Sequence, residues 1–439
     1  MDTRSSSLEM VTGGAACGAG GPAAGAAVGA SDHNTFASSG AWSKAESVGF
    51  TVAWNDSDTE AEPDPPDWTK AVPEEVLQRL TPREKKRQDV INELFHTERS
   101  HVRNLKVLDC VFYRPMLEQG ILPSEQIQLL FANLDEMLEI HSQFNSAMKA
   151  KRRENPIVER VGDILLNMLD GPCGENFERA AAKFCARQQI ALESLKETRR
   201  NNARLNSFLT DAEMKPVCRR LQLKDIIPTG MLRLTKYPLL FESLAKYTDD
   251  DGKTEGSSMG KERSQILRAL ERSKRILDSV NQAVREAEDQ HRLQVIQQRL
   301  EKNHFEKADH PMSSEFKNLD LTKYQLIYEG ALTWRAGNRS KTVDLHVVLL
   351  EEIVILLLKQ DDKFVLKFHY VSSGPVGGVG GGGSSKGGQE DLKVVSPIIK
   401  LATVLGILNF LYKRAFFLVN TSGAQIYELV AVSSSERKT

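Results

Sequence analysis

The stretch CRRLQLKDIIPTGMLRLTKYPLLFESLAKYT, from Cys218 to Thr248, combines two properties that rarely occur together. Its leucines, isoleucines and aromatic residues recur at helical spacing, which indicates a helix with a buried side. It also carries several cations, among them Arg219, Arg220, Lys224, Arg233 and Lys236. These cations form either a solvated face or a surface for an acidic partner, to whose carboxylates arginine offers two parallel hydrogen bonds. The cluster is too small, and its interleaved aromatic residues too few, to favour nucleic acid.

Helical spacing extends on both sides of this stretch, over about 72–303. Thr81 and Pro82 are typical of a helix start, because a capping hydroxyl is followed by proline in the first turn. That helix is expected to run to about 112, and further helices are expected near 124–150, 157–169, 175–200, 203–213, 218–248 and 261–300. No strand-like alternation interrupts them, so this segment predicts an elongated all-α helical bundle.

The pattern changes after about residue 318. Short segments rich in β-branched and aromatic residues, such as YQLIYEGALTW and AQIYELVAV, are separated by turns such as AGNRSK and KQDDK. They predict a mostly-β, barrel-like domain over 318–439, joined to the bundle by a linker at 304–317. The segment SSGPVGGVGGGGSSKGGQED predicts a flexible, Gly-rich insertion near 372–390.

The first part of the chain has a different composition. Residues 1–67 are rich in glycine, alanine and proline and predict a disordered tail, because they cannot bury enough apolar surface to offset the entropy of ordering. Ten acidic and two basic residues give 1–68 a net charge of −8, within a chain whose total is −1. The remainder is therefore mildly basic, at +7.

Several classes of protein are excluded by what the sequence lacks. The five cysteines are scattered without a CxxC pair, which indicates reduced thiols and neither a disulfide framework nor a zinc site. The start lacks a signal-peptide pattern. The best apolar run is broken by Glu351 and Glu352 and is shorter than the roughly 20 residues of a membrane span. HTERSH is not a zinc-protease motif, and P-loop and GxSxG motifs are absent. We expect a soluble intracellular protein without covalent chemistry, cofactor or metal.

Three polar residues lie within or beside apolar stripes. Glu98 shares a helical face with Leu94 and Val102. A carboxylate there is costly unless it is used on a partner or satisfied by an internal arginine, and the spacing leaves both interpretations open. Asn281 lies at the shoulder of a later stripe, where an exposed polar residue is the simpler interpretation. Lys236 lies between two leucines, where a lysine can cover apolar surface with its stem.

Three segments resemble the conserved regions of Dbl-homology (DH) domains. VINELFHTERSHVRNLKVLD (90–109) resembles the first region, the opening stretch resembles the third, and ILDSVNQAVREAE (276–288) resembles the last helix. The β domain resembles the pleckstrin-homology (PH) domain that follows in this family. CRRLQLKDIIP, LDLTK and YEGALTW are most similar to the leukaemia-associated RhoGEF and PDZ-RhoGEF group, whose members carry an RGS-like domain. The likeness covers about 68–436.

The resemblance implies a guanine nucleotide exchange factor that promotes GDP release from RhoA-type small GTPases. Such a domain binds the nucleotide-free GTPase tightly and remodels its switches, so that GDP and Mg²⁺ leave. By motif position, Glu98 is expected to contact switch I, and Lys236 and Asn281 are expected to hold switch II. Arg220 and Lys224 match positions that face acidic residues peculiar to Rho, and Arg233 belongs to the same cationic docking face.

The resemblance also implies roles for the second domain. Phe417 and Val419 match an exposed apolar patch that binds GTP-loaded Rho in relatives. We expect a cytoplasmic protein with peripheral membrane contact through this domain. Control by heterotrimeric G proteins is not assigned, because no RGS-like domain fits before residue 68. Leu232 replaces the usual glutamine, and the chain ends before the closing PH helix. These departures leave an alternative open, a non-catalytic GTPase- or membrane-binding adaptor.

Overall fold

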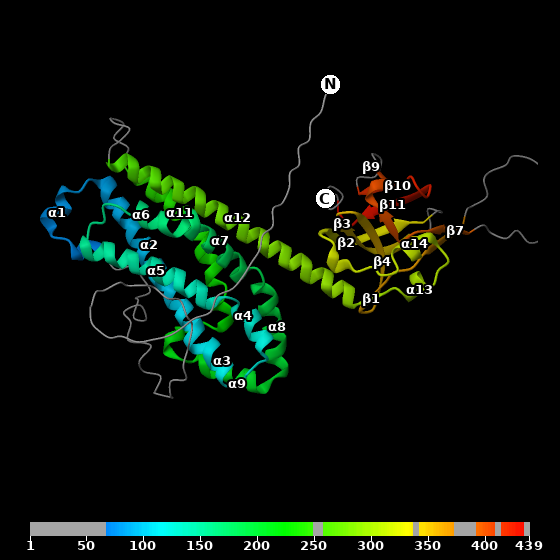
Figure 1. The fold of residues 1–439 in the computed structure, drawn as a ribbon, viewed down its shortest axis with the longest axis horizontal. Helices are drawn as coiled ribbons and strands as arrows, with labels where there is room; N and C mark the ends of the chain where they lie inside the picture. The colour runs from blue at the N-terminus through cyan, green and yellow to red at the C-terminus, as the bar shows by residue number, and fades with distance from the viewer. Residues whose placement is uncertain (1–66, 249–257, 337–341, 373–391, 409–413, 434–439) are drawn as a thin grey trace, which may run out of the picture. The chain divides into compact units, whose positions relative to one another are not determined.

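The computed structural model describes residues 67–248, 258–336, 342–372, 392–408 and 414–433. These residues form a helical unit followed by a β-sheet unit (Figure 1), which confirms the predicted fold class. The predicted tail, apart from Asp67, and the Gly-rich insertion, apart from Ser372, lie outside the described residues, as does the end of the chain after Ser433. Among the described helices, none combines the length and low charge that crossing a bilayer requires.

The helical unit begins with a short turn of helix and ends with the longest helix of the described chain. Its elements are η1 (Trp68–Ala71), α1 (Glu74–Arg79), α2 (Pro82–Val107), η2 (Leu108–Tyr113, a π-helix), α3 (Arg114–Glu118), α4 (Ser124–Phe131), α5 (Leu134–Glu154), α6 (Gly162–Leu169), α7 (Gly171–Cys185), α8 (Gln188–Asn201), α9 (Ala203–Glu213), η3 (Pro216–Cys218), α10 (Leu223–Ile226), α11 (Thr229–Tyr247) and α12 (Ser258–Gln298). As predicted, Thr81 caps α2: its hydroxyl accepts a hydrogen bond from the Glu84 backbone N–H at 3.1 Å.

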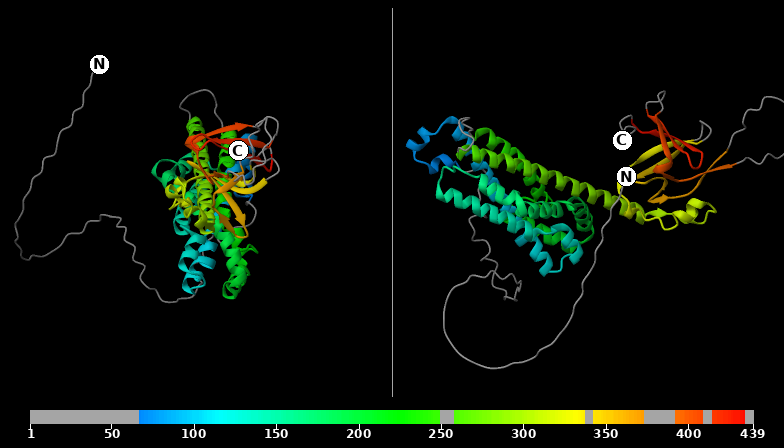
Figure 2. Two further views of the ribbon diagram at one scale, coloured as in Figure 1. Left: turned by 90° about the vertical axis from the view of Figure 1, so that its right-hand side faces the viewer. Right: turned by 45° about the horizontal axis from the view of Figure 1, so that its top comes forward.

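One apolar core joins α2, α5, α7, α11 and α12. In the bundle, α11 packs against both α2 and α12, while α12 packs along α6 and α7 (Figures 1 and 2). Arg83 near the start of α2 donates to the carbonyls of Lys246 and Tyr247 at the end of α11. Further along α2, Glu98 contacts Arg233 near the start of α11. The two helices are therefore antiparallel, and this direction determines which turn of α2 lies beside which turn of α11.

Three segments predicted as single helices are broken in the structure. The segment 175–200 is divided between α7 and α8, with Ala186 and Arg187 between them. The segment 124–150 is divided between α4 and α5 at Ala132, whose φ is 43°. The segment 218–248 contains η3, α10 and α11, separated by a turn in which Arg219 and Arg220 have φ of 48° and 65°. Positive φ is unfavourable for residues with a Cβ, so this turn is strained by roughly 1–2 kcal/mol per residue.

The β unit contains a nine-stranded curved sheet and a separate two-stranded one. Its elements are β1 (Leu300–Glu301), α13 (Asn303–Glu306), α14 (Pro311–Glu315), η4 (Leu321–Lys323), β2 (Leu326–Arg335), β3 (Thr342–Leu350), β4 (Ile353–Gln360), β5 (Lys363–Val365), β6 (His369–Ser372), β7 (Leu392–Val395), β8 (Ile398–Lys400), η5 (Leu401–Thr403), β9 (Val404–Leu408), β10 (Ala415–Asn420) and β11 (Gln425–Ala431). The large sheet has the order β1-β5-β4-β3-β2-β11-β10-β9. Because β8 pairs with β4 and leads through η5 into β9 at the far edge, the sheet curls toward a barrel.

Helix α12 contributes to both cores. Its residues up to Val284 pack in the core of the helical unit, whereas Leu293 and Ile296 are buried in a core of the β unit. Arg292 also donates to both carboxylate oxygens of Glu329 on β2, at 2.5 Å each. The segment predicted as a linker, 304–317, includes α13 and α14, and its Phe305 stacks on Phe368 in that same core.

Candidate functional surface

An exposed stripe runs along α11. Leu232 and Leu239 are 60% and 58% exposed, although leucine side chains are usually buried. Lys236 lies between them and is also exposed. The three residues are spaced four and three positions apart, so they lie on one side of the helix. Lys236 has no hydrogen bond or ion pair with any other described residue. A lysine flanked by exposed leucines can bind a partner surface that is partly apolar and partly acidic.

Glu98 and Arg233 lie inside the bundle, which corrects the expectation that both contact a partner. Glu98 has no exposed surface. Its Oε2 accepts hydrogen bonds from Arg233 Nε at 2.8 Å and from the Tyr237 hydroxyl at 2.7 Å. Its Oε1 lies 2.7 Å from His141 Nδ1 on α5. Arg233 is 5% exposed and also donates to the Thr97 hydroxyl at 2.7 Å. Of the two interpretations of Glu98, the internal arginine is the one that the structure supports.

The surroundings of this network change the ionisation of its members. Burial opposes the charge on Glu98, but the Arg233 guanidinium and His141 outweigh it and hold the pKa of Glu98 well below its usual range. Burial, together with the Glu98 carboxylate, raises the pKa of Tyr237. Burial and the neighbouring His141 lower the pKa of His101, whose ring meets that of His141 edge-on at 4.4 Å. At neutral pH the network therefore holds one carboxylate, one guanidinium and a neutral His101.

These shifts predict that acid weakens the fold in two steps. An unfolded chain binds a proton on His101 as the pH falls through about 6.5, while the folded chain does not, so stability declines below that pH. Glu98 adds a second decline below about 4.5, where only the unfolded chain is protonated. Denaturant unfolding followed by far-UV circular dichroism between pH 7.5 and 4 measures both steps. His101→Leu should flatten the first step, and a stability independent of pH from 7.5 to 5 contradicts the prediction.

The structure offers a different carboxylate for the exposed side of α2. Glu93 is exposed and lies one turn before Thr97, whose hydroxyl contacts Arg233. Because α2 and α11 are antiparallel, Glu93 is level with the turn of α11 that carries Lys236 and Leu239. Helical spacing offers a signal that could have found this residue: Glu93 lies off the apolar stripe that runs through Glu98, and positions off a stripe face solvent.

The other predicted residues lie at accessible positions. Arg220 in the strained turn and Lys224 on α10 are exposed, and neither has an ion-pair partner among the described residues. Asn281 is half-buried on α12, the helix that packs beside α11. No hydrogen bond links Asn281 to Lys236 in the structure. Within the described ranges, no cluster of three His, Cys, Asp or Glu side chains could hold a metal ion.

In the β unit, Phe417 and Val419 lie on the outer face of β10. Their neighbours Phe416 and Leu418 pack on the core, and the alternation of a strand turns the intervening residues outward. The register places Val419 opposite Leu405 of β9 and Ile426 of β11, which are 59% and 64% exposed. Phe417, Val419, Leu405 and Ile426 are called the β10 patch below. Its geometry fits the apolar patch that the resemblance implies.

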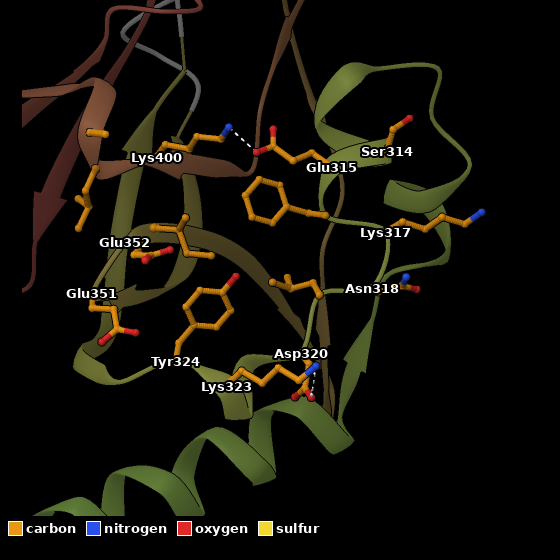
Figure 3. A pocket seen from close by; sticks show the side chains of 15 residues that line it. Ser314, Glu315, Lys317, Asn318, Asp320, Lys323, Tyr324, Glu351, Glu352 and Lys400 are labelled. Atoms are coloured by element: carbon orange, nitrogen blue, oxygen red, sulfur yellow. Dashed lines mark ion pairs between the residues drawn. The ribbon is translucent and has the colours of Figure 1, made fainter. Parts of the chain in front are cut away.

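A hollow of about 770 Å³ opens in the β unit, away from every predicted residue. Its wall includes Phe316 and Tyr324 and several charged residues (Figure 3). Lys400 forms an ion pair with Glu315, and Lys323 lies 3.8 Å from Asp320. Since these charges compensate each other within the wall, the hollow is a weaker candidate than the surface of α11.

Comparison with known proteins gives consistent matches over both units. Residues 90–281 match the RhoGEF domain family, and residues 310–439 match a PH domain family. Human Rho guanine nucleotide exchange factor 11 is 44% identical over 386 residues, which are 87% of this chain and 24% of that protein. Mouse Rho guanine nucleotide exchange factor 1 is 41% identical, over 87% of this chain and 40% of that protein. The chain thus spans less than half the length of these relatives.

Two solved structures are similar over most of the chain. The PDZ-RhoGEF DH/PH domains in complex with GTP-γ-S activated RhoA are 43% identical, with a TM-score of 0.74, over 85% of this chain and 96% of that one. The p115-RhoGEF DH/PH domains are 41% identical, with a TM-score of 0.75, over 86% of this chain and 97% of that one. The similarity therefore covers a DH domain and the PH domain that follows it.

Proposed function

Because the chain belongs to the Rho guanine nucleotide exchange factor family, with a DH domain followed by a PH domain, we propose that it promotes GDP release from a RhoA-type GTPase. The observation that carries this proposal is the stripe formed by Leu232, Lys236 and Leu239. Its lysine has no partner within the described chain, so its charge is available to an acidic switch. Relatives of known structure include complexes with RhoA, which supports this choice of GTPase.

The exchange factor acts by preferring one conformation of its partner. A surface that binds the nucleotide-free GTPase more tightly than the GDP-bound form lowers the barrier to GDP loss, without making or breaking a covalent bond. In this proposal Lys236 and Asn281 hold switch II, and the exposed Glu93 takes the switch I contact that Glu98 cannot reach. At Leu232, where the family usually has glutamine, this chain presents an exposed apolar side chain.

The test is release of a fluorescent GDP analogue from RhoA, Rac and a third Rho-family GTPase, with this chain as the added catalyst. The proposal expects the largest acceleration with RhoA. If release is accelerated from none of them while the chain still binds a GTPase, the adaptor function replaces the exchange function. If Rac responds more strongly than RhoA, the choice of partner is wrong.

Charge complementarity is proposed to set the choice of GTPase through Arg220 and Lys224. Reversing both, Arg220→Glu with Lys224→Glu, should slow exchange on RhoA about tenfold or more, because like charges then face each other. Both side chains are exposed, so stability should change little. The paired measurement is the exchange rate on RhoA and on Rac, and an equal loss on both contradicts a selectivity role. Lys274→Glu, an exposed lysine on α12, is the control for a general charge effect.

The β10 patch is proposed to bind GTP-loaded RhoA. Phe417→Ala with Val419→Ala removes apolar area that the partner would bury, and binding of GTP-loaded RhoA by the chain should weaken about tenfold or more. Ile327→Ala, an apolar residue 55% exposed on β2, should leave this binding unchanged. Titration calorimetry or a pull-down with GTP-γ-S-loaded RhoA measures the effect. Equal binding by the double variant and the control would rule the patch out.

A further inference from the structure

The buried carboxylate of Glu98 is bound by residues on both sides of Lys236. Arg233 lies three positions before Lys236 and Tyr237 follows it directly, and both donate to the same oxygen of Glu98. We propose that Glu98 is a positioning residue for exchange: it fixes the rotation of α11, and so the direction in which Lys236 and its flanking leucines face the GTPase. This inference rests on the proposed exchange function, and it assigns Glu98 a role in which it never touches the partner.

The contacts of Arg233 and Tyr237 with Glu98 fix the rotation of α11 about its own axis. Arg233 and Tyr237 are four residues apart, so they lie on one side of α11 and point into the bundle, while Lys236 points outward. Successive residues of a helix are separated by about 100°. A rotation of α11 by one position would therefore take both donors away from Glu98 and move Lys236 off the exposed stripe.

Directional bonds add to the apolar packing that holds this rotation. Donors near 2.7 Å from a carboxylate oxygen lose energy steeply when they turn away from it. The guanidinium of Arg233 also stacks over the ring of Tyr237, at 4.3 Å from its centroid. His141 approaches the other oxygen of Glu98 from α5. The network thus ties α11 to two other helices at the level of Lys236.

The network is not what stability alone would favour. Both ring nitrogens of His101 and Nε2 of His141 are buried without a hydrogen-bond partner among the described residues. Buried ion pairs with incomplete hydrogen bonding are often less stable than an apolar core of the same volume. Sites where a fold departs from its most stable arrangement are commonly those that serve function. A role in orienting α11 accounts for this departure.

The chain offers a matched control in Glu262. Its carboxylate is also buried and ion-paired, lying 3.4 Å from Arg87 and accepting hydrogen bonds from the backbone N–H groups of Val161 and Gly162. It joins α12 to α2 and α6, and among the described residues it makes no hydrogen bond or ion pair with the stripe on α11. Glu98→Gln and Glu262→Gln therefore remove the same charge from the same depth, and only the first replaces the charged acceptor of the donors beside Lys236 by a weaker, neutral one.

The first experiment compares GDP release from RhoA with these two variants of the full chain, at a temperature where circular dichroism shows both to be folded. Glu98→Gln should lose at least tenfold in rate, and Glu262→Gln less than twofold. In a Lys236→Ala background, Glu98→Gln should add less than twofold, because its effect passes through Lys236. Equal rates for the two single variants, or independent effects of Glu98 and Lys236, overturn the inference.

The second experiment does not depend on exchange activity. Hydrogen–deuterium exchange of the full chain alone should be faster in residues 231–240 for Glu98→Gln than for Glu262→Gln, by about tenfold. If that difference is found while the wild-type chain accelerates no GTPase, the proposed function fails and the orienting contact stands. If 231–240 are protected equally in both variants, the orienting role fails even where the wild-type chain is active.

Discussion

Replacing Lys236 by alanine should slow GDP release from RhoA by about 10- to 100-fold. The side chain is exposed and unpaired among the described residues, so its removal costs the unbound chain no hydrogen bond or ion pair there. In the complex its ammonium would bind an acidic group of the switch region, and hydrogen bonds to charged groups contribute about 1.5–3 kcal/mol. This contact strengthens as the nucleotide leaves, so its free energy lowers the barrier to GDP release. Its loss therefore appears directly in the measured release rate.

The same helix provides the control for Lys236. Lys246 lies near the end of α11, is also exposed, and rests over the ring of Tyr247 at 5.5 Å. Lys246→Ala removes an equal charge from the same helix but outside the stripe, and should retain the wild-type exchange rate within about twofold. If the two alanine variants exchange at the same rate, the stripe on α11 is not the docking face.

Replacing Glu98 by alanine should lower the free energy of unfolding by about 3–5 kcal/mol, the usual effect of removing one partner of a buried ion pair. The substitution leaves the Arg233 guanidinium buried without its carboxylate and removes the acceptor of the Tyr237 hydroxyl. Denaturant unfolding at pH 7.5, followed by far-UV circular dichroism, measures the loss.

Glu93→Ala is the matched variant on the same helix. Glu93 is exposed, so its removal should change stability by no more than about 0.5 kcal/mol. The two substitutions should therefore have different effects. Glu93→Ala slows exchange without loss of stability, whereas Glu98→Ala destabilises the chain. Equal stability of the two variants would contradict the buried position of Glu98.

Most of the architecture could be predicted from local spacing. The start of α2 follows from a hydroxyl and a proline at Thr81 and Pro82, and the change from helical to alternating patterns near residue 318 separates the two units. Both signals depend on neighbours within a few residues. The breaks at Ala132 and at Arg219 could not be predicted, because neither position has the glycine that usually signals a positive φ.

The site was harder to predict for a different reason. Helical spacing placed Glu98 correctly on the apolar stripe of α2, and the same spacing places Arg233 on the buried side of α11 with Tyr237. What spacing cannot reveal is that these two residues, 135 positions apart, meet each other. Because this pairing cannot be seen in the sequence, the resemblance to known motifs led to the expectation that both residues contact the GTPase. For Lys236, spacing showed only a lysine between two leucines, and the structure shows that Leu232 is exposed with it while Leu240 is buried.

The membership of α12 in two cores has a thermodynamic consequence. Fewer than two turns separate Val284, which packs in the helical unit, from Gln290, which donates to the Thr322 carbonyl next to β2. Melting of the β unit would remove Leu293 and Ile296 from their core and fray the same helix that supports Asn281. Heating should therefore give overlapping calorimetric transitions rather than two independent ones. A cut within this interval would leave both sets of core residues complete, but it would interrupt the helix through which the unfolding of the two cores is coupled.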